Sequence, residues 1–243
     1  ILPTNMGANF YNQGIDIKHV ASNVFGVMYM LSSNELQDIS QLEGEVVYNL
    51  GQGNTPDFVF KRVLEINDIE YVEQDTPEEG KVALTYAANA QNLISMMIAG
   101  QIEYAILGEP QVSQAINATQ DEENPFQIVM NLQDEWTNGY PQVSTVARDD
   151  LIENHSDFLD EFLAAVQDNV EWVVANSDDA LSALTANGSN LNGLDTNSVT
   201  RCNINFVTSA NGKEDVEEYL QSMYNFDEMF VGGQMPDEGF YRQ

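Results

Sequence analysis

Apolar and polar positions change their spacing several times along the chain, and each change predicts a different element. Short runs rich in β-branched and aromatic residues predict strands, at residues 45–50, 81–87, 102–107, 126–131 and 140–148. Apolar residues that recur every three or four positions predict helices, at residues 5–13, 57–67, 88–99, 111–118, 157–176, 178–186 and 214–224. This alternation is typical of an α/β fold.

Two stretches have the character of strands that cross between lobes. Residues 19–32 are rich in β-branched and aromatic side chains, exceed the length of an ordinary strand and lack helical spacing. Residues 140–148 form a second long strand of the same kind. We therefore expect a two-lobed protein in which the chain crosses from one lobe to the other and returns.

The chain has 243 residues, with 39 acidic and 8 basic side chains and a formal net charge of −31. Nucleic acids and anionic membrane surfaces are bound through dense lysine and arginine, so both are excluded as partners. The 43% hydrophobic content is that of a folded globule. The longest apolar run, residues 24–31, is far shorter than the roughly 20 residues of a membrane helix.

No motif in the sequence supports catalysis. The chain has no G-x-S-x-G nucleophile motif, and neither His19 nor His155 has an evident partner. A single cysteine, Cys202, excludes an intramolecular disulfide. Residues 1–5 have the character of the end of a buried strand with no residues leading into it, so we expect an upstream section to be missing.

One asparagine-rich loop, residues 187–195, partly matches a calcium-binding loop. Asn190, Asn192 and Gly193 stand at suitable offsets, but Gly188 occupies the first ligand position and Val199 the twelfth. An ordinary turn is therefore predicted, and no metal site.

A glycine loop at residues 51–54 joins a predicted strand to a predicted helix. Its backbone N–H groups and the positive end of the helix dipole can receive a polar or anionic group. We expect Thr55 to be the N-cap and Pro56 the first helical residue, with Asn54 and Thr55 facing a ligand. The loop lacks the Gly-Lys-Ser/Thr of a phosphate-binding loop, and a plain glycine turn is the alternative.

Glu109 follows a buried strand and precedes a helix, where open α/β sheets place their ligands. Its carboxylate can accept hydrogen bonds from a ligand amine, amide or ring N–H, and a purely helix-capping carboxylate is the alternative. Tyr86, Trp136 and Tyr140 stand near the ends of elements and are candidates for the walls of a pocket, although single aromatic residues more often belong to the core.

The order of several segments resembles the solute-binding proteins of ABC importers, in the nitrate, sulfonate, taurine and thiamine-precursor group. The segments are PTNMGANFYNQG, NVFGVMYMLSS, ISQLEGEVVYNLGQGNTPDFVF, NAQNLISMMIAGQIEYAILGEPQVSQA, FLAAVQDNVEWVVAN, RCNINFV and VGGQMPDEGFY. The resemblance implies a type II periplasmic-binding-protein fold. It places lobe 1 at residues 1–27 and 143–243, without its usual N-terminal section, and lobe 2 at residues 28–142.

The resemblance also implies a function, namely capture of a small organic ligand in an interlobe cleft and delivery to a membrane permease. The protein is then an extracytoplasmic, lipid-anchored monomer without enzymatic activity or cofactor. We expect the ligand to contact Thr4, Asn5, Asn54, Thr55, Tyr86, Glu109, Trp136 and Tyr140. With so few cations, and with Arg148 and Arg201 read as structural, a neutral or zwitterionic heterocycle is favoured over a strongly charged anion.

Two alternatives remain open. An enzyme on the same fold, similar to thiamine-pyrimidine synthases or menaquinone-pathway enzymes, requires a positioned His, Lys or carboxylate. The lysines count against it, because all of them fall in polar or surface-like contexts, at Lys18, Lys61, Lys81 and Lys213. The second alternative is a truncated structural or interaction module without a competent site.

Overall fold

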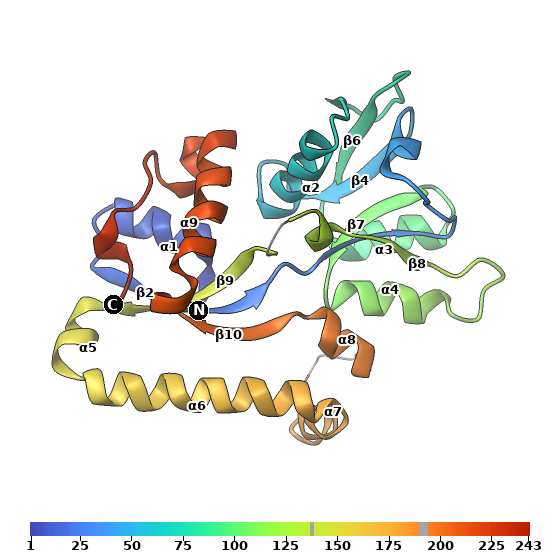
Figure 1. Ribbon diagram of the computed structural model, residues 1–243. Coiled ribbons are helices and arrows are strands. Elements are labelled where there is room, and N and C mark those ends of the chain that lie inside the picture. Colours follow the sequence, from blue (N-terminus) through green and yellow to red (C-terminus); the bar gives the residue numbers. More distant parts are fainter. Residues whose placement is uncertain (137–138, 190–193) are drawn as a thin grey trace. The chain divides into compact units, whose positions relative to one another are not determined.

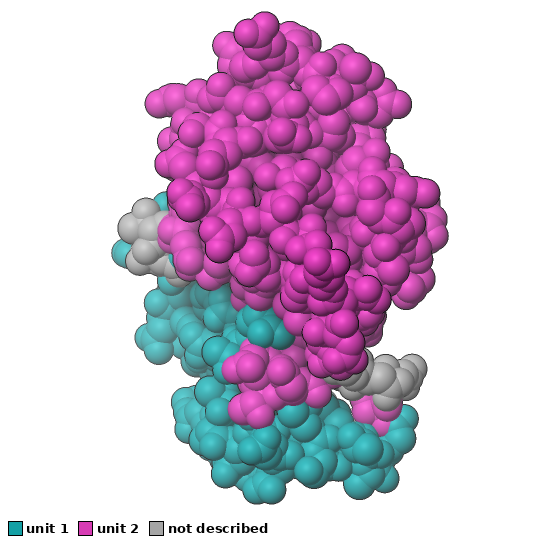
Figure 2. Space-filling model, turned by 90° about the vertical axis from the view of Figure 1, so that its right-hand side faces the viewer, with its two compact units in different colours: residues 1–26, 138–188, 199–243 teal, residues 27–137, 189–198 magenta. Residues whose placement is uncertain are grey.

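The computed structural model describes residues 1–136, 139–189 and 194–243 (Figure 1). The chain forms two compact units, drawn in different colours in Figure 2. Unit 1 comprises Ile1–Gly26, Asn138–Gly188 and Val199–Gln243, and unit 2 comprises Val27–Thr137 and Ser189–Ser198. None of the helices in the described ranges is long and apolar enough to cross a lipid bilayer.

Unit 2 is built around a six-stranded mixed sheet with the order β5-β6-β4-β7-β3-β8. Its strands are β3 (Met28–Ser32), β4 (Val46–Leu50), β5 (Tyr71–Glu73), β6 (Val82–Ala87), β7 (Tyr104–Gly108) and β8 (Gln127–Asn131). β5, β6, β4 and β7 run parallel, whereas β3 is antiparallel to both of its neighbours. The helical elements are η1 (Ile39–Leu42), α2 (Thr55–Ile66), α3 (Ala90–Ile98), α4 (Gln111–Thr119) and η2 (Leu132–Glu135).

The core of unit 2 forms because its central strands are apolar on both faces, as helix-covered sheets require. In β7, Ala105, Ile106 and Leu107 are all fully buried. On one face of the sheet Ala105 and Leu107 meet Leu93 of α3 and Val112 of α4. The strands and helices that alternate in the sequence therefore form a sheet with α3 and α4 packed on one face.

Unit 1 has a four-stranded antiparallel sheet with the order β1-β9-β2-β10. Its strands are β1 (Leu2–Pro3), β2 (Ile17–Phe25), β9 (Pro141–Arg148) and β10 (Ile204–Thr208). Figure 1 shows α1 (Thr4–Asn12) and α9 (Ser209–Phe226) on one side of the sheet and the long α6 (Ser156–Ala175) on the other. The other helical elements of unit 1 are α5 (Asp149–Asn154), α7 (Ser177–Ala186), η3 (Glu228–Val231) and η4 (Glu238–Phe240), and α8 (Thr196–Arg201) is divided between the two units after Ser198.

The structure corrects the prediction of one continuous strand over residues 19–32. This stretch is two strands, β2 and β3, and the chain passes from unit 1 to unit 2 between Gly26 and Val27. The Gly26 N–H donates to the Tyr140 carbonyl at 2.9 Å, within unit 1, whereas the Val27 carbonyl accepts from the Glu109 N–H at 3.2 Å, within unit 2. Each half of the stretch is therefore bonded into a different sheet.

The predicted N-cap of α2 is wrong by one residue. The Phe58 N–H donates to the Asn54 carbonyl at 3.0 Å, so Asn54 is the N-cap of α2 and Thr55 is already helical. Pro110 precedes α4, which begins at Gln111 as predicted, and His155 precedes α6, which begins at Ser156, one residue before the predicted start. Backbone hydrogen bonding sets these starts, and none of the three N-cap side chains makes a capping hydrogen bond.

Only one stripe of the amphipathic helix α6 is buried. Leu159 and Leu163 pack with Val20 and Ala147 of the sheet. Phe158 and Phe162 lie on the neighbouring stripe, stack on each other with ring centroids 6.4 Å apart, and remain 60% and 44% exposed. Helical spacing identified the helix, but it did not distinguish the stripe that meets the sheet.

His19 of β2 is a fully buried, titratable group in unit 1. Its Nε2 lies 3.3 Å from Ser22 Oγ, and Nδ1 has no hydrogen-bond partner among the described residues. Burial lowers the pKa of the His19 side chain from 6.5 to about 4. Because the folded pKa lies below the unfolded one, protonation favours unfolding, and stability is lost as the pH falls from 6.5 towards 4.

We predict that His19→Phe, surrounded by the rings of Phe240 and Tyr241, removes this pH dependence. Between pH 6.5 and 4 the wild-type protein should lose about 3 kcal/mol of unfolding free energy more than the variant does. Urea unfolding at several pH values measures the difference, with His155→Phe on the surface as the control. Equal pH dependence in wild type and His19→Phe would contradict the prediction.

Thr4 gives a second prediction for unit 1. Its buried hydroxyl donates to the Pro141 carbonyl at 2.5 Å and lies 2.7 Å from Ser144 Oγ, joining the start of α1 to β9. We expect Thr4→Val to lower the unfolding free energy by about 1–3 kcal/mol, because the buried carbonyl and hydroxyl lose their partner. Denaturant unfolding checks this, with the exposed Thr76→Val as the matched control; an unchanged midpoint would refute it.

Candidate functional site

The carboxyl ends of the parallel strands β6, β4 and β7 lie side by side at one edge of the unit 2 sheet. The three connections that follow them are residues 51–54, 88–89 and 109–110, and they lead into α2, α3 and α4. β8 also ends at this edge, since Asn131 pairs with Tyr29 and the adjacent Met28 pairs with Gly108. Open α/β sheets bind ligands beyond these strand ends.

Five of the predicted ligand residues lie at or just beyond this edge of unit 2: Asn54, Thr55, Tyr86, Glu109 and Trp136. The other three, Thr4, Asn5 and Tyr140, lie in unit 1. The tertiary structure thus brings together residues from four connections that are far apart in the sequence.

The glycine loop needs its glycines for its own conformation. Gly51 and Gly53 have φ angles of 62° and 75°, in the left-handed region that favours glycine. A Cβ atom on Gly51 would lie 2.5 Å from Asn54 Nδ2. The Asn54 N–H donates to the Gly51 carbonyl at 2.8 Å and closes the turn. Asn54 is exposed, and the half-buried Thr55 hydroxyl makes no hydrogen bond within the described part of the chain.

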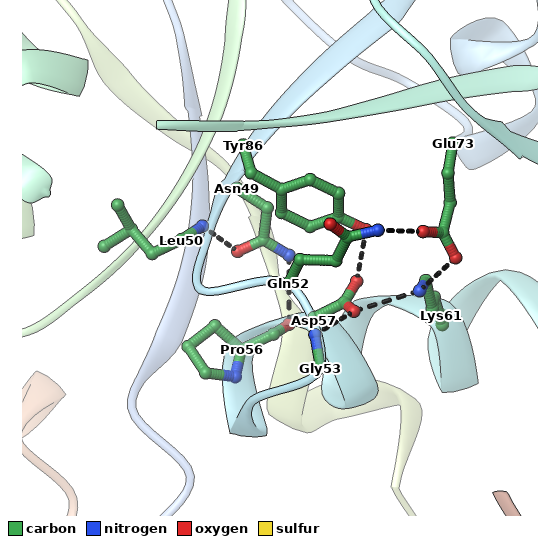
Figure 3. A network of polar contacts seen from close by, with 9 residues as sticks. All are labelled: Asn49, Leu50, Gln52, Gly53, Pro56, Asp57, Lys61, Glu73 and Tyr86. Carbon is green, nitrogen blue, oxygen red and sulfur yellow. Dashed lines mark hydrogen bonds and ion pairs between the residues drawn. The ribbon is translucent and has the colours of Figure 1, made fainter. Parts of the chain in front are cut away.

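A buried polar network lies directly behind this loop (Figure 3). Asp57 is its centre: Oδ2 accepts from the Gly53 N–H at 2.8 Å and from Lys61 Nζ at 2.9 Å. Asp57 Oδ1 accepts from the Tyr86 hydroxyl at 2.7 Å. Lys61 Nζ also donates to Glu73 Oε1 at 2.7 Å. Tyr86, predicted as a pocket wall, therefore has its hydroxyl committed to Asp57.

The network shifts the pKa values of Lys61, Glu73 and Tyr86. Burial by itself lowers the pKa of Lys61, but its hydrogen bonds to Glu73 and Asp57 outweigh that cost and raise it. The hydrogen bond from Lys61 lowers the pKa of the Glu73 carboxyl. Burial and the hydrogen bond to Asp57 raise the pKa of the Tyr86 hydroxyl. The lysine is thus held as a cation between two carboxylates.

The prediction that Lys61 occupies a surface-like context is wrong, because the residue is only 4% exposed. Lys61 lies among apolar helix positions, and Val59, Phe60 and Val63 are fully buried around it. The spacing of Asp57 and Lys61, four residues apart on one helix, is the signal that would have found the pair.

Glu109 holds the start of α4. Its carboxylate accepts from the Ser113 N–H at 3.2 Å and from the Ser113 hydroxyl at 2.8 Å and 2.9 Å. Ser113 Oγ in turn lies 2.6 Å from Ser198 Oγ. These contacts are those of the capping alternative, and the carboxylate is half-buried.

The remaining predicted residues are engaged in packing. In unit 2, Trp136 meets Phe58 edge to face, with ring centroids 6.0 Å apart. In unit 1, the fully buried Tyr140 stacks on Tyr219 at 5.3 Å. Asn5 Nδ2 donates to the Phe230 carbonyl at 3.2 Å, and the Thr4 hydroxyl is bonded as described above. The polar groups of Thr4 and Asn5 are therefore engaged within unit 1.

Other candidate chemistry lies away from this edge. The three positions of the partial calcium loop, Asn190, Asn192 and Gly193, lie outside the described residues. Elsewhere, in the ranges that the structure describes, no three His, Cys, Asp or Glu side chains are placed to hold a metal ion. A cavity of about 610 Å³ in unit 1 is lined by Arg148, and the guanidinium of that residue pairs with Asp150 through contacts of 3.0 and 2.7 Å.

Comparisons with known proteins relate this geometry to other chains. The NMT1/THI5-like family model matches residues 10–180. An ABC transporter structure from Parabacteroides distasonis has a TM-score of 0.81 and 25% identity, over 100% of this chain and 79% of that one. The periplasmic aliphatic sulphonate-binding protein SsuA from Escherichia coli has a TM-score of 0.71 and 14% identity, over 99% of this chain and 74% of that one.

A third solved structure is the alkanesulfonate-binding protein SsuA from Xanthomonas axonopodis pv. citri bound to MOPS. Its TM-score is 0.59 at 13% identity, over 97% of this chain and 75% of that one. No curated protein sequence matches the chain.

These comparisons confirm two of the predictions. The mixed α/β architecture is that of the type II periplasmic binding proteins, as the order of segments predicted. The family prediction is also confirmed, because the matching family model and the similar structures, an ABC transporter and two sulfonate-binding proteins, belong to the predicted group. Since the family model covers residues 10–180, well over half of the sequence, the chain belongs to the NMT1/THI5-like family.

Proposed function

We propose that this chain is the solute-binding protein of an ABC importer. It captures a small organic ligand at the carboxyl edge of the unit 2 sheet and delivers it to the permease, outside the cytoplasm. The observation that carries the proposal is the convergence of four connections at one sheet edge, in a chain whose fold matches importer components over its whole length. The ligand contacts proposed here lie in unit 2 alone.

The charges at this edge indicate the class of ligand. The first turn of α2 contains the Asp57 carboxylate, and the start of α4 holds the Glu109 carboxylate. All three basic residues of unit 2 pair with carboxylates, in the described part of the chain: Lys61, Arg62 and Lys81. A bare inorganic anion would meet these carboxylates without an available cation. A neutral or zwitterionic organic molecule with an N–H donor facing Glu109 fits better.

A binding role also fits better than catalysis at this edge. Lys61 is the buried lysine here, and two carboxylates hold it as an ammonium group, which is not a nucleophile. Of the two histidines, His19 is buried among aromatic rings of unit 1 and His155 lies at the start of α6. Glu109 does accept from the Ser113 hydroxyl here, but Ser113 is only 2% exposed, so the edge offers groups that bind and orient a ligand.

We predict that an aminopyrimidine or taurine, a zwitterionic sulfonate, stabilises the protein, whereas nitrate and sulfate do not. Thermal-shift screening followed by isothermal titration measures this, with MOPS as a further sulfonate. A bound ligand at 100 times its Kd should add about 2.7 kcal/mol to the unfolding free energy. Tight binding of an inorganic anion would overturn the ligand class, and no binding across neutral, zwitterionic and anionic compounds would count against a solute-binding role.

We predict that Glu109→Gln weakens binding of that ligand by about 10- to 100-fold, because a hydrogen bond to a charged acceptor becomes one to a neutral acceptor. The amide oxygen of the variant can still accept from Ser113, so α4 should keep its start. Isothermal titration at neutral pH checks this, with the exposed Glu103→Gln as the matched control. Equal affinity in the two variants would mean that Glu109 only caps the helix.

A further inference from the structure

Two consecutive residues of the glycine loop are tied to two different carboxylates. The Gly53 N–H donates to Asp57 at 2.8 Å, and the Gln52 side-chain amide donates to Glu73. Asp57 lies in the first turn of α2, whereas Glu73 ends the edge strand β5. The loop is therefore anchored from a helix on one side and a strand on the other, as Figure 3 shows.

One cation joins these two anchors. Lys61 Nζ lies 2.9 Å from Asp57 Oδ2 and 2.7 Å from Glu73 Oε1. The phenol rings of Tyr71 and Tyr86 also face the ammonium, with their centroids at 5.6 and 6.0 Å. Without the ammonium, the Asp57 carboxylate, which is only 1% exposed, would face the Glu73 carboxylate, whose side chain is 39% exposed. Like charges repel at short range, and burial of Asp57 strengthens the repulsion.

We propose that Lys61 is a positioning residue for the glycine loop. By holding Asp57 and Glu73 together, it fixes Gln52 and Gly53 and so orients the adjoining Asn54 and Thr55. Lys61 acts through the two carboxylates and does not contact the ligand. The effect on ligand affinity rests on the proposed function, whereas the effect on the loop does not.

The next residue of the same helix provides a matched control. Arg62 makes a single ion pair, to Glu65 at 3.3 Å, and both side chains are at least 40% exposed. Arg62 and Lys61 are neighbours of equal charge, but Lys61 joins Asp57 to Glu73, whereas Arg62 pairs with Glu65 on the surface. Exposed pairs of this kind contribute little to structure.

Hydrogen–deuterium exchange of the full chain tests the positioning role without any ligand. We expect Lys61→Met to raise the exchange rate of the Gly53 and Asn54 backbone amides, which donate to Asp57 and to the Gly51 carbonyl, at least 10-fold at neutral pH. The amides of Val47 in β4 and Leu64 in α2 should keep their wild-type rates, and Arg62→Met should leave all of these unchanged. Loop rates in Lys61→Met within twofold of those in Arg62→Met would overturn the proposal.

A double variant separates the charge of Lys61 from its packing. Glu73→Gln removes one carboxylate but keeps an oxygen that accepts from Gln52. In Lys61→Met/Glu73→Gln only the Asp57 carboxylate remains, so we expect the slow exchange of Gly53 to return to within threefold of wild type. A role of Lys61 in filling space alone predicts no such rescue, and its absence would overturn the proposal.

The same variants are tested for binding with taurine and an aminopyrimidine as probes. If a probe binds the wild type, Lys61→Met should weaken its affinity at least 10-fold and the double variant should recover most of the loss; unchanged affinity would overturn the inference.

If neither probe binds, the exchange data still decide whether Lys61 orders the loop. If Lys61→Met does not fold, Glu73→Gln alone, which removes the charge that Lys61 holds on β5, should speed exchange of the Asn54 amide at least threefold, and an unchanged rate would refute the inference.

Discussion

Parallel pairing of β6, β4 and β7 is the constraint on which the candidate site depends. Parallel strands must each be followed by a crossover, and their carboxyl ends come to the same edge. The glycine loop, the turn before α3 and the Glu109–Pro110 turn are consequently neighbours in unit 2. Because β3 and β8 also meet this edge, η2 and Trp136 after β8 join the same region.

Acidic residues have different roles on the surface and at this edge of the sheet. The chain carries a net charge of −31, and its exposed acidic residues, such as Asp121, Glu122 and Glu123, form a solvated coat. At the site the carboxylates have partners within the chain: Asp57 binds Gly53, Tyr86 and Lys61, and Glu109 binds Ser113. The acidic composition thus serves solubility on the surface and loop geometry at the sheet edge.

The sequence indicated the elements better than their contacts. Strand–helix alternation predicted most of unit 2, but the three-residue strand β5 was missed, because so short a segment leaves little periodic signal. Glu73, at the end of that strand, is one of the two loop anchors, so missing β5 also meant missing the network. Lys61 was misjudged for a related reason. A charged residue on an amphipathic helix is usually exposed, and only its partners reveal that it is buried.

By itself, the sequence determined the α/β class, the glycine loop, the Glu-Pro turn and the order of segments that marks the family, because these depend on local spacing and on residue types with special backbone preferences. Tertiary structure decided which of the candidates share a sheet edge, which stripe of α6 is buried, and that the Tyr86 hydroxyl and Lys61 bind Asp57. Those outcomes depend on contacts between segments distant in the sequence, and no local pattern encodes them.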